Sequence, residues 1–247
     1  MKAQATGSGP GPVALVGSGE FLPVMEAVDA ALLAGRPPRL AFLPTAAAQE
    51  GAERVDYWVE LATEHCRRLG VEAVPVLALD RAGADDPRLA ALIAGAGLVY
   101  LSGGNPGYLA ETLRGSLVFD AIVAAWRDGA ALAGCSAGAM ALTAVADDVR
   151  TGAPYPGLGV VPDLVVLPHF DRLEGWRPGV VGVWQSRLGA GQVLLGIDEE
   201  TALVGGSGPW RVAGRQRVWL LGVDGVRQSF EAGEKLDLPA AAARAPA

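Results

Sequence analysis

The fold of this chain is decided by residues 131–140, which read Ala131-Leu132-Ala133-Gly134-Cys135-Ser136-Ala137-Gly138-Ala139-Met140. The stretch predicts a short apolar strand, a turn of very small residues and then a helix. Gly134, Ser136 and Gly138 fit the pattern G-x-S-x-G, which builds a sharp turn that holds one hydroxyl above the end of a sheet. A plain β-to-α turn without chemistry can carry the same pattern, so the interpretation depends on the rest of the chain.

Short buried strands alternate with helices along most of the sequence. Working outward from the turn, strands are predicted at residues 97–101, 71–79, 39–44 and 13–16, and helices at 118–127, 108–113, 86–94, 50–69 and 23–34. This alternation is typical of an α/β fold and predicts a three-layer, mostly parallel sheet. Three later strands, at residues 201–206, 210–213 and 217–221, predict a small antiparallel edge near the C-terminus.

The length of 247 residues is that of one domain. We expect a flexible leader at residues 1–12, a single α/β hydrolytic domain at residues 13–238 and a disordered tail at residues 239–247. Residues 147–162 are rich in proline and glycine and predict a long loop that could act as a lid. A helix is predicted at residues 178–188.

Charge and composition exclude several classes of protein. A formal net charge of −7 argues against nucleic-acid binding, which needs a basic surface. The two cysteines, Cys66 and Cys135, cannot form a disulfide framework and suit a reducing compartment. There is no signal-peptide pattern and no apolar run long enough to span a membrane, so a cytoplasmic protein without a membrane partner is expected. The His and Cys residues lack metal-ligand spacing, so no metal and no cofactor are expected.

A dinucleotide site is only weakly indicated after the first strand. Gly17 and Gly19 begin the pattern G-x-G-x-x-G, but its third glycine is replaced by Leu22. Glu20 lies where α/β sheets bind ligands, yet a structural acid in the first turn of a helix is the favoured interpretation.

Ser136 fits the centre of the turn better than its neighbour Cys135. In the cysteine register the flanking glycines would be alanines, so Cys135 is expected to be a buried residue under the turn. A serine nucleophile needs a base, and His169 is the histidine that follows the turn, directly after a β-branched strand. The alternative is a structural histidine bound to a backbone carbonyl.

A base of this kind also needs an acid to orient it. The strand that ends at Ile197 runs into three carboxylates, Asp198, Glu199 and Glu200. Any of the three could be the orienting acid, and a solvated acidic loop is the alternative. Spacing alone does not choose among them.

At this point the chain resembles the cyanophycinase and aspartyl dipeptidase (peptidase E) family of serine peptidases. The order serine, histidine, acid differs from the usual α/β-hydrolase order. The resemblance covers about residues 13–204 and is carried by Leu101-Ser102-Gly103-Gly104-Asn105, Gly134-Cys135-Ser136-Ala137-Gly138-Ala139, Pro168-His169-Phe170 and Gly196-Ile197-Asp198-Glu199. It implies a class I glutamine-amidotransferase-like sheet with serine in place of cysteine.

The resemblance also implies roles for individual residues. Ser136 would be the nucleophile, His169 the base and Glu199 the orienting acid. The oxyanion would be bound by the backbone N–H groups of Gly104 and Ala137.

The expected function is a serine peptidase that hydrolyses small peptides, with a dipeptidase-like substrate size. Asn105 and Arg172 are the candidate substrate-binding residues. Arg172 could bind a substrate carboxylate, or it could pair with Asp171 or Glu174. The alternatives are a non-catalytic binding module of the same fold and an esterase or amidase for small molecules. A homodimer is possible.

Overall fold

The computed structural model describes residues 9–147, 152–206 and 209–239. Within them the main sheet has eight strands. From edge to edge these are β14 (Lys235–Leu236), β11 (Trp210–Gly214), β10 (Thr201–Gly205), β1 (Val13–Val16), β5 (Ala131–Cys135), β4 (Leu98–Leu101), β2 (Arg39–Leu43) and β3 (Glu72–Pro75).

The central part of this sheet is parallel. β1 pairs with β5, β5 with β4, β4 with β2, and β2 with β3, all in parallel. β10, β11 and β14 continue the sheet as antiparallel strands. The prediction of a mostly parallel sheet with an antiparallel C-terminal edge is therefore confirmed.

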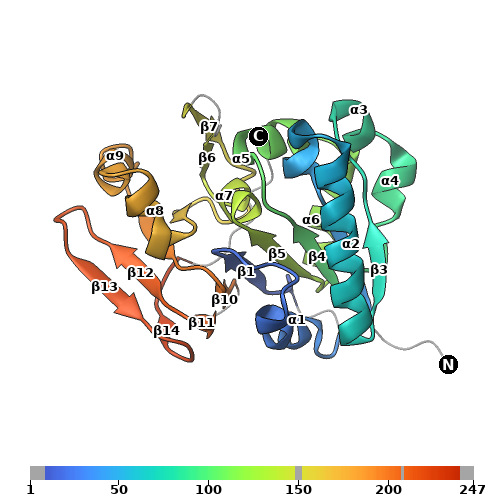
Figure 1. The fold of residues 1–247 in the computed structure, drawn as a ribbon, viewed down its shortest axis with the longest axis horizontal. Coiled ribbons are helices and arrows are strands. Elements are labelled where there is room, and N and C mark those ends of the chain that lie inside the picture. The colour runs from blue at the N-terminus through green and yellow to red at the C-terminus, as the bar shows by residue number, and fades with distance from the viewer. Residues whose placement is uncertain (1–8, 148–151, 207–208, 240–247) are drawn as a thin grey trace.

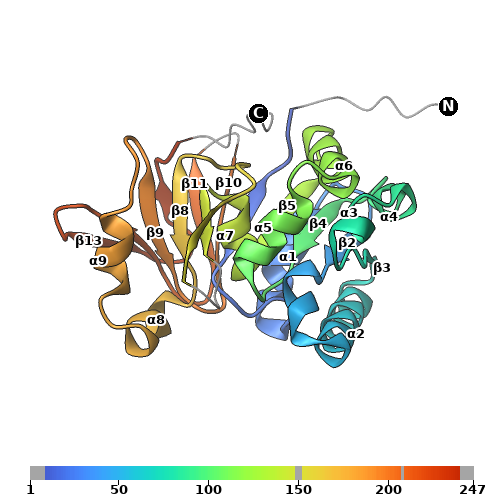
Figure 2. The ribbon, with the colours of Figure 1, turned by 90° about the horizontal axis from the view of Figure 1, so that it is seen from above.

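Helices cover both faces of the main sheet. One face carries α1 (Glu26–Leu33) and α2 (Ala52–Leu69). The other face carries α5 (Pro106–Leu113), α6 (Leu117–Arg127) and α7 (Ala137–Leu142). Figure 2 shows α2 and α6 on opposite sides of the sheet. The remaining short helices near the main sheet are η1 (Pro23–Met25), η2 (Thr45–Glu50), α3 (Arg81–Ala84) and α4 (Pro87–Ala91). The strands are buried on both faces because successive side chains point to opposite sides: Val13 and Leu15 face α5–α7, and Ala14 and Val16 face α1 and α2.

A second sheet stands beside the main one, on the left in Figure 1. It contains β13 (Arg227–Phe230), β12 (Val218–Leu221), β9 (Val193–Ile197) and β8 (Leu164–Leu167), together with α8 (Phe170–Trp176) and α9 (Val180–Gln185). β8 and β9 are parallel, so their carboxyl ends lie at the same edge. The sequence did not predict this sheet.

One strand prediction was wrong as a result. Residues 217–221 were expected to extend the antiparallel edge of the main sheet, but β12 pairs with β9 instead. Gly214, at φ 96°, ends β11 in a conformation that favours glycine. Beyond it, Trp219 Nε1 donates to Asp198 Oδ1 at 3.0 Å, which ties β12 to the end of β9.

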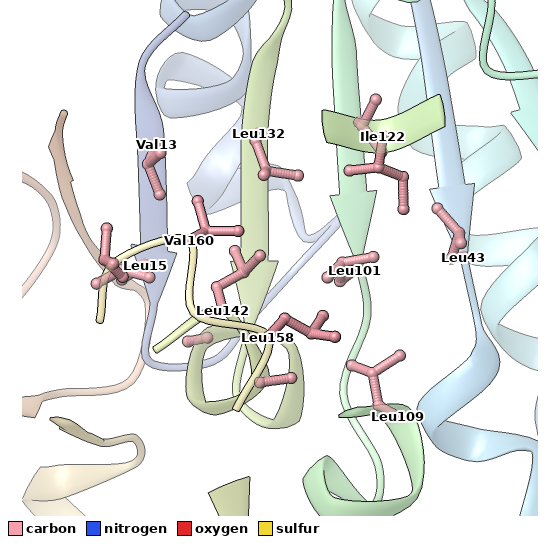
Figure 3. Packing of buried hydrophobic residues seen from close by; sticks show 14 of the residues in the cluster. Val13, Leu15, Leu43, Leu101, Leu109, Ile122, Leu132, Leu142, Leu158 and Val160 are labelled. Carbon is pink, nitrogen blue, oxygen red and sulfur yellow. The ribbon is translucent and has the colours of Figure 1, made fainter. Parts of the chain in front are cut away.

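The long loop predicted at residues 147–162 contains one short strand that the sequence did not predict. This strand, β7 (Pro154–Pro156), forms an antiparallel ribbon with β6 (Val145–Asp147). Leu158 and Val160 then enter the same core cluster as Leu142 of α7 (Figure 3). These contacts anchor the segment, while residues 148–151, on which the lid prediction also falls, lie outside the described residues.

The chain ends are held more closely than expected where the structure describes them. Gly11, inside the predicted leader, donates its N–H to Trp126 O, and its carbonyl accepts from Trp126 Nε1. Pro239 is the first residue of the predicted tail, and its carbonyl accepts a hydrogen bond from Trp210 Nε1. Residues 1–8 and 240–247 are outside the described part. A search of the described helices found none with the length and apolar character needed to cross a membrane.

Candidate active site

Ser136 sits on a strained turn between β5 and α7. Its backbone has φ 49° and ψ −106°, a conformation that costs a non-glycine residue free energy and is concentrated at functional sites. The turn needs glycine on both sides. A Cβ on Gly134 would lie 2.5 Å from Gly138 C, and a Cβ on Gly138 would lie 2.2 Å from Leu101 O. These close approaches are the physical reason for the glycines of the G-x-S-x-G pattern.

His169 and Glu199 come from the second sheet. His169 follows β8 and Glu199 follows β9, so the parallel pairing of these strands brings both residues to one edge. His169 Nε2 is 3.0 Å from Ser136 Oγ, and His169 Nδ1 is 2.9 Å from Glu199 Oε1. Because a carboxylate only accepts, the proton of the second hydrogen bond belongs to Nδ1. Nε2 of a neutral imidazole is then free to accept the Ser136 hydroxyl proton.

The two acids beside Glu199 have other partners. Asp198 is buried, accepts from Trp219 Nε1 and from the Arg217 N–H, and has a pKa raised by that burial. Glu200 Oε2 is 2.8 Å from Arg215 Nη1. Of the three carboxylates that the sequence left open, Glu199 is therefore the one in contact with His169.

Glu199 is itself held by two neighbours that sequence reasoning missed. Its N–H donates to Asp171 Oδ1 at 2.9 Å, and its carbonyl accepts from Gln216 Nε2 at 3.0 Å. Asp171 is two residues after His169, which was a usable local signal. Gln216 lies in the connection from β11 to β12. The sequence predicted that this connection stays at the antiparallel edge of the main sheet, so it did not bring Gln216 to Glu199.

Gly104 and Ala137 border the space around Ser136. Gly104 has φ 138°, and a Cβ there would lie 2.3 Å from Ala46 O, so the turn after β4 requires glycine. Ala137 is the first residue of α7, where backbone N–H groups have no partner inside the helix. Gly104 and Ala137 line the same cavity as Ser136 and His169.

Glu20 lies under this site, and the interpretation of it as a helix acid was wrong. The chain turns at Phe21, with φ 64°, and helical structure begins only at Pro23. Glu20 is 4% exposed, its Oε1 accepts from the Gly103 N–H at 2.9 Å, and its Oε2 accepts from the Cys135 thiol at 2.8 Å. It thus joins the glycine turn after β4 to the end of β5.

Cys135 has the buried position that the sequence predicts. Burial raises the pKa of its thiol well above the usual value, and the negative charge of Glu20 raises it further. A thiol that stays protonated is a poor nucleophile. Ser136 is therefore the group at this turn that His169 can activate.

The two candidate substrate-binding residues, Asn105 and Arg172, are less well placed to contact a substrate than the residues around Ser136. Asn105 is 5% exposed and caps α5, where its Oδ1 accepts from the Tyr108 N–H, and its Nδ2 donates to Gln49. Arg172 pairs with Asp171 and lies 3.9 Å from Glu199 Oε2, with a side chain that is 64% exposed. Neither residue lines the two cavities that contain Ser136.

Both of those cavities include Ser136. The larger, of about 320 Å³, includes Ser18, Glu20, Arg54, Tyr57 and Trp58. The smaller, of about 180 Å³, includes Met140, Asp147, Leu173, Trp176 and Trp184. The ring of Trp176 is 5.6 Å from that of His169, centre to centre. In the described residues no group of three or more His, Cys, Asp and Glu is arranged to hold a metal ion.

A comparison with models of protein families shows the family to which this chain belongs. Residues 13–208 match the model of peptidase family S51. The chain belongs to peptidase family S51. This confirms the resemblance drawn from the sequence, and membership of family S51 implies serine peptidase activity.

Two solved structures are similar to this S51 chain. A peptidase from an acI-B1 Actinobacterium is 36% identical, with a TM-score of 0.86, and the match covers 94% of this chain and 98% of the other. A Listeria monocytogenes EGD-e protein assigned as peptidase E is 16% identical, with a TM-score of 0.61 and coverage of 84% and 100%. The second likeness shows the fold alone. None of the curated proteins matches this chain.

Proposed function

We propose that this chain hydrolyses small peptides through a triad of Ser136, His169 and Glu199. The observation that carries the proposal is the continuous series of hydrogen bonds from Glu199 Oε1 to His169 to Ser136 Oγ, at 2.9 and 3.0 Å. A base within hydrogen-bonding reach of the nucleophile, itself oriented by an acid, is the arrangement that activates a serine hydroxyl.

The reaction follows from these positions. His169 Nε2 takes the proton as Ser136 Oγ attacks the carbonyl carbon of the peptide bond. The C–N bond then breaks, His169 returns the proton to the leaving amine, and an acyl group remains on Ser136. Water activated by His169 hydrolyses that ester. Glu199 holds the imidazole in the correct tautomer and stabilises its positive charge.

The negative oxygen of the tetrahedral intermediate needs hydrogen-bond donors. We assign this role to the backbone N–H groups of Gly104 and Ala137, because both residues border the cavity at Ser136. Side chains contribute nothing to such a donor pair, which agrees with the small residues at both positions.

The size of the site supports short substrates. The cavities beside Ser136 measure about 320 and 180 Å³, room for a few side chains rather than an extended chain. This favours a dipeptidase-like activity. The parallel order β1-β5-β4-β2-β3, with the serine turn after β5, supports assignment to the class I glutamine-amidotransferase-like folds.

The test is covalent labelling with a fluorophosphonate, read as the intact mass of the protein. Wild type should gain one adduct, Ser136→Ala should gain none, and His169→Ala should be labelled far more slowly than wild type. Ser18→Ala is the matched control, because Ser18 lines the same cavity as Ser136. Folded wild type without an adduct would contradict the proposal and favour a non-catalytic module, and an adduct on Ser136→Ala would identify a different nucleophile.

A further inference from the structure

Asp147 is a buried carboxylate beside the nucleophile with no role in the proposed reaction. It ends β6, is 3% exposed and lines the smaller cavity together with Ser136 and His169. Among the described residues, no group donates a hydrogen bond to its Oδ1. Buried polar atoms are nearly always paired, so this oxygen requires an explanation.

Among the described residues, the cation that lies within 4 Å of Asp147 does not satisfy its carboxylate. Arg177 Nη1 is 3.9 Å from Asp147 Oδ2, which is too long for a hydrogen bond, and the Arg177 side chain is half exposed. A pair with such an exposed partner contributes little, and its arginine can turn into solvent when another cation approaches. The carboxylate is therefore available to a ligand in the cavity.

A purely structural role for this carboxylate finds little support. In the ribbon, Asp147 pairs with Pro154 of β7, and β-ribbons are held by backbone groups rather than by side-chain carboxylates. No group in the described part of the ribbon donates a hydrogen bond to Asp147 Oδ1.

Arg177 also borders the cavity, and the rest of its wall is mostly apolar. Its walls are formed by Met140, Leu167, Leu173, Trp176, Val180 and Trp184. Burial raises the pKa of Asp147 to about 6, against the lowering effect of Arg177 and Arg187. At neutral pH the cavity thus holds the negative charge of Asp147, only loosely paired with Arg177, at an apolar surface next to the reacting serine.

We infer that this cavity binds a positively charged group of the substrate and that Asp147 determines this specificity. The group is an ammonium or guanidinium on an apolar stem, because the stem packs on the tryptophan and aliphatic walls while the cation donates to the free oxygen. Lysine and arginine side chains fit this description, and a substrate's N-terminal amine is the other source. The inference rests on the proposed peptidase function.

The test uses dipeptides that differ only in charge. Lysine and norleucine share the same straight carbon chain, so Lys-Ala and Ala-Lys are compared with Nle-Ala and Ala-Nle, each with a free and an acetylated N-terminus. The readouts are kcat/KM and protection of Ser136 from fluorophosphonate labelling, so that peptides that bind without being cleaved also report. The variants are Asp147→Asn and the control Glu174→Gln. Glu174 lies on α8, and its carboxylate accepts from Arg227 of β13, outside the cavity.

Wild type should prefer the charged peptide by at least about tenfold, the scale of one hydrogen bond to a charged group. Asp147→Asn should reduce that preference to less than about threefold, and Glu174→Gln should keep it. If the preference follows the lysine side chain, that side chain is the cation; if it follows the free N-terminus, the amine is. Either result supports the inference.

The results of this comparison that would overturn the inference are distinguishable. Labelled wild type that treats charged and uncharged peptides alike would overturn the inference while leaving the peptidase proposal intact. Wild type that is neither labelled nor active would overturn the proposed function and the inference with it.

A second measurement uses the wild-type protein alone. As pH falls through about 6, Asp147 takes up a proton and loses its charge. The ratio of kcat/KM for the charged peptide to that for its uncharged partner should therefore fall toward one between pH 8 and pH 5. Any effect of pH on the triad itself affects both peptides and cancels from the ratio. A ratio that stays constant would overturn the inference.

Discussion

The two sheets contribute to the site in different ways. On the main sheet, Ser136 and Gly104 are placed by backbone geometry, because the turns after β5 and β4 leave no space for a Cβ at their glycines. On the second sheet, His169 and Glu199 are placed by side-chain and backbone hydrogen bonds, such as those that Asp171 and Gln216 make to Glu199.

This difference determines how each side should respond to substitution. A steric constraint fails abruptly, since any side chain at Gly134 or Gly138 must push backbone aside. A hydrogen-bonded arrangement weakens in steps, one partner at a time. The following predictions test the contrast, beginning with the largest expected effect.

Among the groups that position His169, loss of the Glu199 carboxylate should be the most damaging. Glu199→Gln keeps the shape but no longer fixes the imidazole tautomer, and kcat should fall by about 10²- to 10⁴-fold. Asp198→Asn and Glu200→Gln are the matched controls, and steady-state kinetics should show a much smaller loss for each. An equal loss in Asp198→Asn would mean that the acid has been misassigned.

A methyl group at the main-sheet turn should disrupt both fold and activity. In Gly138→Ala the new Cβ would lie 2.2 Å from Leu101 O, and we expect a loss of about 1–3 kcal/mol in the free energy of unfolding. Gly182→Ala in α9 is the control, because nothing lies within 4 Å of its Cβ, and it should be neutral or slightly stabilising. Urea unfolding compares the two, and equal stabilities would refute the steric account.

Glu20 supports the main-sheet turns through its side chain. Glu20→Gln replaces an acceptor by a donor facing either Gly103 N–H or the Cys135 thiol, and kcat should fall roughly tenfold with KM little changed. Cys135→Ala keeps the bond to Gly103 and should have a smaller effect. If Cys135→Ala is the worse variant, the turn after β4 does not depend on Glu20.

The smallest effect is expected at Gln216. Gln216→Ala removes one hydrogen bond to the Glu199 carbonyl, and kcat should fall by about two- to tenfold. Gln228→Ala, on the exposed strand β13, is the control and should be silent. A loss as large as that of Glu199→Gln would show that the second-sheet side also fails abruptly.

The contrast also explains which features could be predicted from sequence. The turn at Ser136 was predictable because its constraint is local: neighbouring glycines are visible as a pattern within five residues. His169 was predictable as the histidine that follows a strand end. The parallel core of the main sheet followed from the alternation of strands and helices.

Features that depend on distant contacts were not predictable. Glu20 resembles a helix acid in its local sequence, but its partners lie 83 and 115 residues away. The pattern of β12 suits either sheet, and only its pairing with β9 decides between them. The acid could not be chosen among Asp198, Glu199 and Glu200 because the choice depends on Trp219, His169 and Arg215.

The central claim is that Glu199 acts on Ser136 through His169, across the two sheets. The most direct test is the rate of fluorophosphonate labelling of Ser136 in His169→Ala, in Glu199→Ala and in the double variant. If the three residues act as one unit, the double variant should be labelled as slowly as His169→Ala alone. If Glu199→Ala lowers the rate by the same factor with and without His169, the two residues act independently and the account is wrong.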